Sequence, residues 1–126
     1  MKKLILSLFV LVIFAGCSSN DPNSTVDPSF TPTGKVYSRY IMQNVSLSGQ
    51  LNSYLFNVYT FTSTTTVVRT SISIPNQPVD SNPQYLTYEF NNPDITFKNI
   101  NGEITDRGKF KSDKSLYIGS DCYNLK

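Results

Sequence analysis

The chain has 126 residues, which is enough for one domain, and it contains no His, no Trp and two Cys. The lack of His excludes Ser-His-Asp and Cys-His nucleophile pairs and imidazole metal sites, and two Cys are too few for a four-thiolate zinc site. The formal net charge of +2 gives no electrostatic case for nucleic-acid binding. We therefore expect a non-catalytic protein with no metal and no cofactor.

The N-terminal segment has the pattern of a signal peptide. Lys2 and Lys3 precede an uncharged run from Leu4 to Phe14 in which only Ser7 is polar. As a helix, this run would be roughly 16 Å long, about half of the ~30 Å hydrocarbon core of a bilayer. The run is therefore too short for a spanning helix, and it predicts the apolar region of a signal peptide over residues 1–16.

The next four residues, Phe14-Ala15-Gly16-Cys17, resemble the lipobox of bacterial lipoproteins. The resemblance implies cleavage between Gly16 and Cys17 and a diacylglycerol attached to the Cys17 sulfur as a thioether. It also implies a lipid-anchored protein of the bacterial cell envelope. The residue after the cysteine is Ser18 rather than Asp, which favours the outer membrane. The alternative is an ordinary secreted protein that is cut nearby.

Processing at this site changes the charge balance and the role of the second cysteine. Removal of residues 1–16 leaves nine basic against nine acidic side chains, which gives no case for a polybasic membrane patch. Acylation of Cys17 would also rule out an intramolecular disulfide with Cys122. Because Asp121 disfavours a thiolate at its neighbour, we expect Cys122 to be a buried or half-buried structural residue.

Residues 17–33 form a lipidated cysteine followed by a predicted tether. Three prolines interrupt the stretch, and its only other apolar residues are Val26 and Phe30. Such a segment buries too little surface to offset its ordering entropy, so we expect it to be disordered. The folded domain is then predicted over residues 34–126.

β-branched and aromatic residues dominate the predicted domain, and no stretch has a helical period. We expect an all-β domain, an antiparallel meander of seven or eight strands that forms a barrel or a barrel-like sandwich. The two longest connections are predicted at residues 43–52 and 75–83. The predicted strands are Lys35–Met42, Ser53–Thr62, Thr66–Ile74, Gln84–Phe90, Asp94–Lys98, Ile104–Lys111, Ser115–Ile118 and Cys122–Leu125.

Alternation of side chains assigns faces to most of these strands. One face of the fourth strand holds Leu86, Tyr88 and Phe90, and we expect it to pair with Ile95 and Phe97 of the next strand. In the third strand, one face is apolar and the opposite face is polar. The apolar face consists of Val68, Thr70, Ile72 and Ile74, and the polar face of Arg69, Ser71 and Ser73.

The strand from residue 53 to 62 has large side chains on both faces. Leu55, Tyr59 and Phe61 lie on one face, and Tyr54, Phe56 and Val58 lie on the other. A strand packed on both sides has this pattern, and so has a strand whose outer face is an interface. Tyr54, Phe56 and Val58 are therefore the candidate interaction face.

A lipobox, a tether rich in Ser, Asn and Pro, and a meander that opens with Gly34-Lys35-Val36-Tyr37 together resemble the small lipoproteins of Bacteroidetes-type bacteria with a lipocalin-like domain. The segments 59–68 and 88–97 are similar to their second and third hairpins. The resemblance implies a small lipocalin-like barrel, but Val36 stands where lipocalins usually have Trp. It implies no ligand and no catalytic residue.

A domain of this size has little room for a cavity, and its many Tyr and Phe predict a filled interior. The charged stretch from Asp106 to Lys114 mixes both signs and is predicted as a solvated edge strand. Two functions remain open. The first is a non-catalytic binding module for a small apolar or glycan ligand, and the second is an adaptor that docks on another envelope protein through the candidate interaction face.

Overall fold

The computed structural model describes residues 26–45, 47–49, 51–74 and 83–126. The predicted signal peptide, Cys17 and the first part of the predicted tether lie outside these residues. The described chain is all-β and has eight strands. They are β1 (Val36–Val45), β2 (Leu51–Phe61), β3 (Thr66–Ile74), β4 (Gln84–Asn91), β5 (Asp94–Lys98), β6 (Ile104–Phe110), β7 (Leu116–Ile118) and β8 (Asp121–Leu125).

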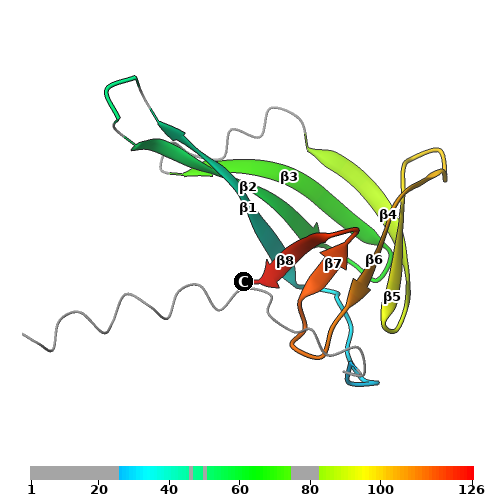
Figure 1. Ribbon diagram of the computed structural model, residues 1–126. Helices are drawn as coiled ribbons and strands as arrows, with labels where there is room; N and C mark the ends of the chain where they lie inside the picture. Colours follow the sequence, from blue (N-terminus) through cyan, green and yellow to red (C-terminus); the bar gives the residue numbers. More distant parts are fainter. Residues whose placement is uncertain (1–25, 46, 50, 75–82) are drawn as a thin grey trace, which may run out of the picture.

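Each strand pairs antiparallel with the next, and β8 returns to β1, so the meander closes into a small barrel of the lipocalin-like type (Figure 1). The predicted fold class is confirmed. Closure rests on a short ladder in which Tyr37 is opposite Leu125 and Ser38 is opposite Asn124. The backbone N–H of Lys126 adds a hydrogen bond of 2.9 Å to the carbonyl of Val36.

The sequence underestimated the first hairpin. β1 extends to Val45 and β2 begins at Leu51, so most of the predicted connection over residues 43–52 is strand. The β1–β2 ladder shifts register between Tyr40 and Met42 and again between Asn44 and Val45. Each β-bulge interrupts the two-residue alternation, which removed the sequence signal for a strand.

Strands β1–β3 continue beyond the barrel as a three-stranded extension (Figure 1). We use this name for residues 40–45 of β1, 51–57 of β2 and 70–74 of β3. The β3–β4 ladder ends where Arg69 is opposite Gln84, whereas the β2–β3 ladder runs on to the pair of Tyr54 and Ile74. The extension therefore has sheet but no surrounding barrel.

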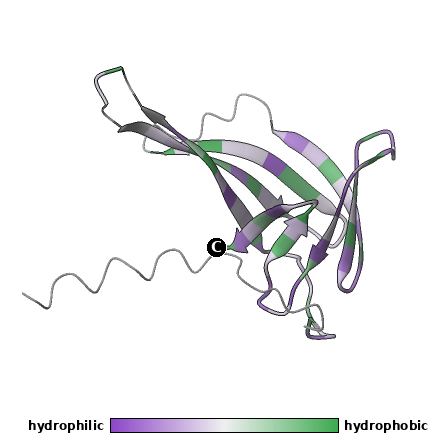
Figure 2. Cartoon of the chain, viewed as in Figure 1, coloured by the Kyte–Doolittle hydropathy of each residue, from purple (hydrophilic) through white to green (hydrophobic). Residues whose placement is uncertain are grey.

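Aromatic side chains fill the barrel interior, as the sequence predicted. The ring of Phe61 lies 5.0 Å from Tyr88 and 5.7 Å from Tyr37, and Tyr59 lies 5.3 Å from Phe97. Figure 2 shows hydrophobic and hydrophilic residues alternating along the strands, as expected for a sheet with one buried face. The strand residues of the buried cluster are Tyr37, Tyr59, Phe61, Val67, Leu86, Tyr88, Ile95, Phe97, Phe110, Leu116 and Tyr123.

Residues 26–33 do not form a disordered tether. Val26 and Phe30 belong to the buried core, and Pro32 is also buried. The Phe30 ring lies 5.0 Å from Phe110 and 6.0 Å from Phe90. The sequence prediction was wrong here because isolated apolar residues between prolines gain their burial only from a surface that distant strands create. We call residues 26–33 the plug, and the folded domain includes it.

One buried side-chain polar atom of the described residues has no hydrogen-bond partner. Among the described residues, the Tyr37 hydroxyl oxygen is buried and makes no hydrogen bond. Burial raises the pKa of Tyr37 well above its usual range, because the ionised form would lose its hydration.

Replacement of Tyr37 by Phe is expected to stabilise the domain. It removes a hydroxyl whose desolvation is uncompensated, so the free energy of unfolding should rise by about 1 kcal/mol. Since the raised pKa is a folded-state property, the wild-type protein should also lose stability as the pH rises above about 10, and the variant should lose less. Urea unfolding at neutral and alkaline pH measures both effects. A loss of stability in the variant at neutral pH would contradict this account.

Candidate functional site

Two rows of side chains lie at the open end of the barrel, one inside the barrel and one where the inner sheet face continues into the extension. The cross-strand ladders align Tyr37, Tyr59, Arg69 and Gln84 in a lower row across β1–β4. Two residues further along the strands, they align Arg39, Asn57 and Ser71 in an upper row. The lower row begins with the buried Tyr37 and Tyr59 and ends with the polar Arg69 and Gln84, so the barrel changes from apolar to polar at this level.

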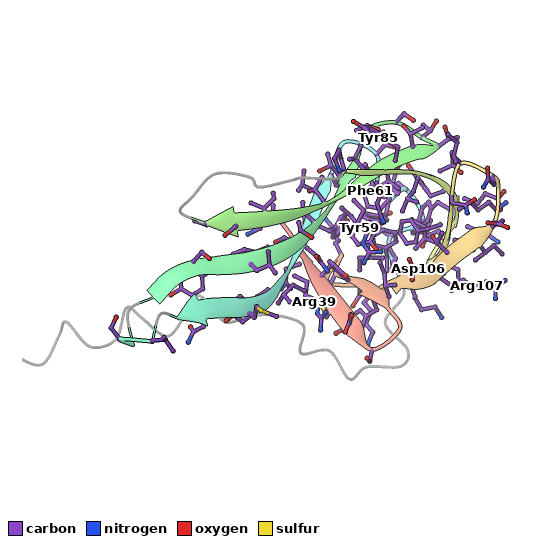
Figure 3. All side chains as sticks on the ribbon, turned by 90° about the horizontal axis from the view of Figure 1, so that it is seen from above. Arg39, Tyr59, Phe61, Tyr85, Asp106 and Arg107 are labelled. Carbon is purple, nitrogen blue, oxygen red and sulfur yellow. The ribbon has the colours of Figure 1, made fainter. Side chains whose placement is uncertain are left out.

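An ion pair crosses this open end. The Arg69 Nη1 atom on β3 lies 3.9 Å from the Asp106 Oδ2 atom on β6, and both side chains are about one-third exposed. Because β4 and β5 separate these strands in the sheet, the pair spans the barrel interior. The Arg69 guanidinium also lies 5.7 Å from the centre of the buried Tyr59 ring. In Figure 3, Tyr59 lies within the ring of strands, whereas Arg107 points outward.

A second ion pair lies where β1 and β8 separate. The Arg39 Nη2 atom is 2.8 Å from the Asp121 Oδ1 atom. The β1–β8 ladder includes neither residue, so their side chains span the part of the seam that the backbone leaves open. Each ion pair joins one positive and one negative side chain, so the two pairs add no net charge to the open end of the barrel.

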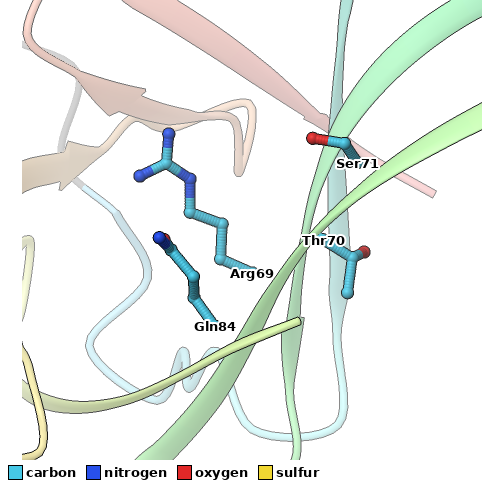
Figure 4. Close-up of a pocket in the computed structure, with 4 residues that line it drawn as sticks. All are labelled: Arg69, Thr70, Ser71 and Gln84. Atoms are coloured by element: carbon cyan, nitrogen blue, oxygen red, sulfur yellow. The ribbon is translucent and has the colours of Figure 1, made fainter. Parts of the chain in front are cut away.

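A shallow pocket adjoins the Arg69 ion pair. It has a volume of about 190 Å³ and is lined by Arg69, Thr70, Ser71 and Gln84 (Figure 4). The side chains of Arg69 and Gln84 extend in the same direction, and Thr70 points away from them. The lining is polar, so the pocket suits a hydrogen-bonding ligand better than an apolar one.

The outer face of the three-stranded extension is apolar. Tyr40, Tyr54 and Ile74 are 49%, 39% and 51% exposed, and Ile72 is half-buried. The Tyr40 ring lies 5.8 Å from Phe56, and the Lys126 ammonium lies 5.4 Å from the centre of the Phe56 ring. We call Tyr40, Tyr54, Phe56, Ile72 and Ile74 the outer aromatic face.

The predicted candidate interaction face overlaps this surface in part. Tyr54 is exposed and Phe56 is half-buried, but Val58 is only 6% exposed. The apolar face predicted for the third strand also lies outside the barrel, because Val67 and Arg69 point inward. The exposed surface therefore centres on Tyr54 and Ile72 rather than on Val58.

Sequence reasoning missed the clearest signal of this surface, which is the absence of charge. No Asp, Glu, Lys or Arg occurs between Arg39 and Arg69, and none occurs between Arg69 and Asp80. These intervals contain the whole extension. An uncharged projecting sheet with an apolar outer face differs from an ordinary solvated surface.

The predicted edge strand is not an edge. β6 pairs with β5 on one side and with β7 on the other. Arg107 and Lys109 are exposed, but Asp106 points to the interior because it is opposite Phe97 in the ladder. The mixed charges therefore divide between the solvent and the open end of the barrel.

Cys122 is half-buried, which agrees with the predicted structural role, and it is disulfide-bonded. The sequence analysis expected no intramolecular disulfide, because acylation of Cys17 would rule one out. Cys17 is the second cysteine of the chain and lies, with Gly16, outside the described residues. A thioether-linked lipid on Cys17 and a disulfide from Cys17 to Cys122 would use the same sulfur atom, so they exclude each other.

Other kinds of site are not found in the described part of the chain. No group of three or more acidic, Cys or His side chains there is arranged to hold a metal ion. Among the same residues, no helix has the length and hydropathy needed to cross a bilayer.

Comparisons of the chain with protein-family models, with curated proteins and with solved structures give no match. The fold therefore defines the class. The protein is a small, eight-stranded, lipocalin-like β-barrel with a filled interior, a polar open end and an apolar face on a projecting sheet.

Proposed function

We propose that the chain is a lipid-anchored protein of the bacterial envelope whose barrel is a non-catalytic interaction module. In this proposal the barrel docks on another envelope protein through the outer aromatic face. The observation that carries it is the exposed apolar surface of Tyr40, Tyr54 and Ile74 on a sheet without charged residues. The cores of protein interfaces are enriched in aromatic residues and depleted of charge in the same way.

A protein partner suits this surface better than a lipid surface. The strands of the extension contain no Lys or Arg, and the Lys126 ammonium over Phe56 is a single charge, whereas binding to anionic headgroups uses clusters of basic residues. Its strands also have sheet-edge backbone groups, which need hydrogen-bond partners that hydrocarbon does not supply. The partner is therefore expected to present an apolar and uncharged surface.

A ligand inside the barrel has less support. Aromatic side chains fill the interior around Phe61, and the plug packs on Phe110 at one end. An apolar ligand of the lipocalin kind would have to displace this core. A polar ligand at the open end remains compatible with the fold.

The anchoring part of the proposal rests on the sequence Phe14-Ala15-Gly16-Cys17 after a short apolar run. It requires that the Cys17 sulfur carries the lipid in the anchored protein, so Cys122 then has no disulfide within its own chain. Two or three acyl chains would meet or exceed the two-signal requirement for stable membrane attachment. The nine-residue segment 17–25 would then separate the lipid from the first described residue, Val26. The outer membrane is the proposed location.

Replacement of Cys17 by Ala is expected to abolish lipid attachment and to leave the unprocessed precursor. The reason is that the thioether can form only on a thiol. Metabolic labelling with an alkyne fatty acid, followed by the intact mass of the purified protein, measures both effects. Normal labelling of the variant would contradict the proposal.

The intact mass of the wild-type protein provides a further control. A mass that includes a diacylglycerol on the segment beginning at Cys17 supports the anchor. An unlipidated mass with Cys17 linked to Cys122 would instead mean that the chain is a disulfide-bonded secreted protein.

The docking surface is tested by a photo-crosslinking amino acid placed at Tyr54 in living cells. We expect one discrete protein adduct, which the additional substitution of Ile72 by Lys should abolish. The matched control is a crosslinker at Ile100, which is 91% exposed in the β5–β6 turn. Equal adducts from both positions, or adducts with lipid alone, would contradict docking. An adduct with the mass of two copies of the chain would mean that this face mediates self-association and not docking on another envelope protein.

A further inference from the structure

We infer that the open end of the barrel binds a neutral, polyhydroxylated ligand, such as the terminal sugar of a glycan, between Arg69 and Asp106. This inference is independent of the proposed docking, which uses the opposite face of the same strands. It rests on the geometry of the ion pair, the side chains next to it and their charge balance.

The two charged groups of the ion pair lie near each other but are not directly hydrogen-bonded. The distance of 3.9 Å between Arg69 Nη1 and Asp106 Oδ2 is longer than a hydrogen bond. The Arg69 guanidinium lies 5.7 Å from the centre of the Tyr59 ring, within the range of a cation–π contact. A hydroxyl group between the two charged groups could accept a hydrogen bond from Arg69 and donate one to Asp106, and both would be charge-assisted.

The neighbouring side chains extend this site with uncharged hydrogen-bonding groups. Gln84 is opposite Arg69 in the β3–β4 ladder and lines the same pocket. In the upper row, the Ser71 hydroxyl donates a hydrogen bond of 3.0 Å to the Asn57 Oδ1 atom. That contact occupies the amide oxygen of Asn57 and leaves its N–H groups available to a ligand oxygen. The two rows are roughly 7 Å apart along the strands, the rise of two strand residues.

Charge balance selects a neutral ligand. Arg69 and Asp106 cancel each other, and Arg39 and Asp121 form a second balanced pair at this end. An anion would be repelled by Asp106 and a cation by Arg69. An apolar ligand would leave both charges desolvated and would find the interior below filled by Tyr59.

The experiment uses the full chain in a detergent without a sugar head group. The probes are three neutral oligosaccharides (maltotriose, cellotriose and N-acetyllactosamine) and the acidic digalacturonic acid. Binding is measured by saturation-transfer NMR and by calorimetry. We expect at least one neutral probe to bind with a Kd in the range of about 1 mM, and digalacturonic acid to bind about tenfold more weakly.

Variants identify the site. Arg69→Gln and Asp106→Asn should each weaken the neutral probe about tenfold, the effect of losing one charge-assisted hydrogen bond. The matched control is Arg107→Gln. It makes the same substitution as Arg69→Gln, but at a residue next to Asp106 on the outer face of β6, and it should change the Kd less than about twofold. Melting curves confirm that the variants are folded.

Three results would overturn the inference. They are no binding of any neutral probe at about 10 mM, tighter binding of digalacturonic acid, or equal effects of Arg69→Gln and Arg107→Gln. None of these results bears on docking, because the crosslinking at Tyr54 tests the outer face separately.

Discussion

Replacement of Phe61 by Glu is expected to unfold the domain. Phe61 is 1% exposed, and its ring contacts Tyr37, Tyr88, Phe97 and Phe110. Loss of a buried aromatic side chain typically costs ~3–5 kcal/mol, and the glutamate adds an unpaired buried carboxylate. Because the free energy of unfolding of a small domain is ~5–15 kcal/mol, the two costs together should leave the variant unfolded near room temperature, with no cooperative melting transition.

Replacement of Phe56 by Glu is the matched control, because it places the same substitution five residues away on the opposite face of β2. Phe56 is half-buried and points away from the core, and the Lys126 ammonium lies over its ring. A carboxylate there stays solvated and meets a positive charge, so the melting temperature should change little.

Circular dichroism melts of the two full-length variants distinguish the alternatives. Collapse of both variants would mean that β2 is packed on both sides, and docking through the outer face would lose its support. Tolerance of both would contradict the filled interior. If Phe56→Glu is tolerated, it should also reduce the adduct from the crosslinker at Tyr54.

The strands were predictable where alternation and turn residues agree. The third and fifth predicted strands have the observed bounds, because β3 and β5 end at clear turn signals. Gly102 in the β5–β6 turn has a φ of 81°, a conformation that favours glycine and matches the predicted Asn101-Gly102 turn. Local sequence was sufficient for these elements.

The rest of the fold depends on contacts that local sequence does not encode. The two bulges of β1 hid the length of the first hairpin, and the plug is buried only because β4 and β6 supply Phe90 and Phe110. The polar end of the barrel was missed for the same reason. Arg69 and Asp106 are far apart in the sequence, and only closure of the barrel brings them together.

The charge-free extension was different, because its signal was present in the sequence. Two uncharged intervals separated by a single Arg69 are visible without a structure. Uncharged intervals alone do not identify a surface, because a pair of buried strands is also uncharged. The distinction depends on whether the side chains are exposed to solvent. The structure supplies that exposure at Tyr40, Tyr54 and Ile74.

Removal of the plug is expected to destabilise the barrel strongly, although the sequence analysis predicted residues 17–33 to be a disordered tether outside the domain. Deletion of residues 1–33 removes Val26, Phe30 and Pro32 and exposes the rings of Phe90 and Phe110. It also removes the hydrogen bond of 2.9 Å that the Asn92 side chain donates to the carbonyl of Asp27. Loss of the Phe30 side chain alone should cost ~3–5 kcal/mol.

The matched comparison is a deletion of residues 1–25, which begins the chain at Val26 and keeps every described contact of the plug. We expect this shorter deletion to unfold cooperatively in urea and the longer one to show a much lower midpoint or no transition. The single substitution Phe30→Ala in the full chain should lie between them, because it removes the ring contacts but keeps the backbone hydrogen bond from Phe30 to Asp27. Equal midpoints for the two deletions would mean that residues 26–33 contribute little to stability, and the domain would then begin at Gly34 as the sequence analysis predicted.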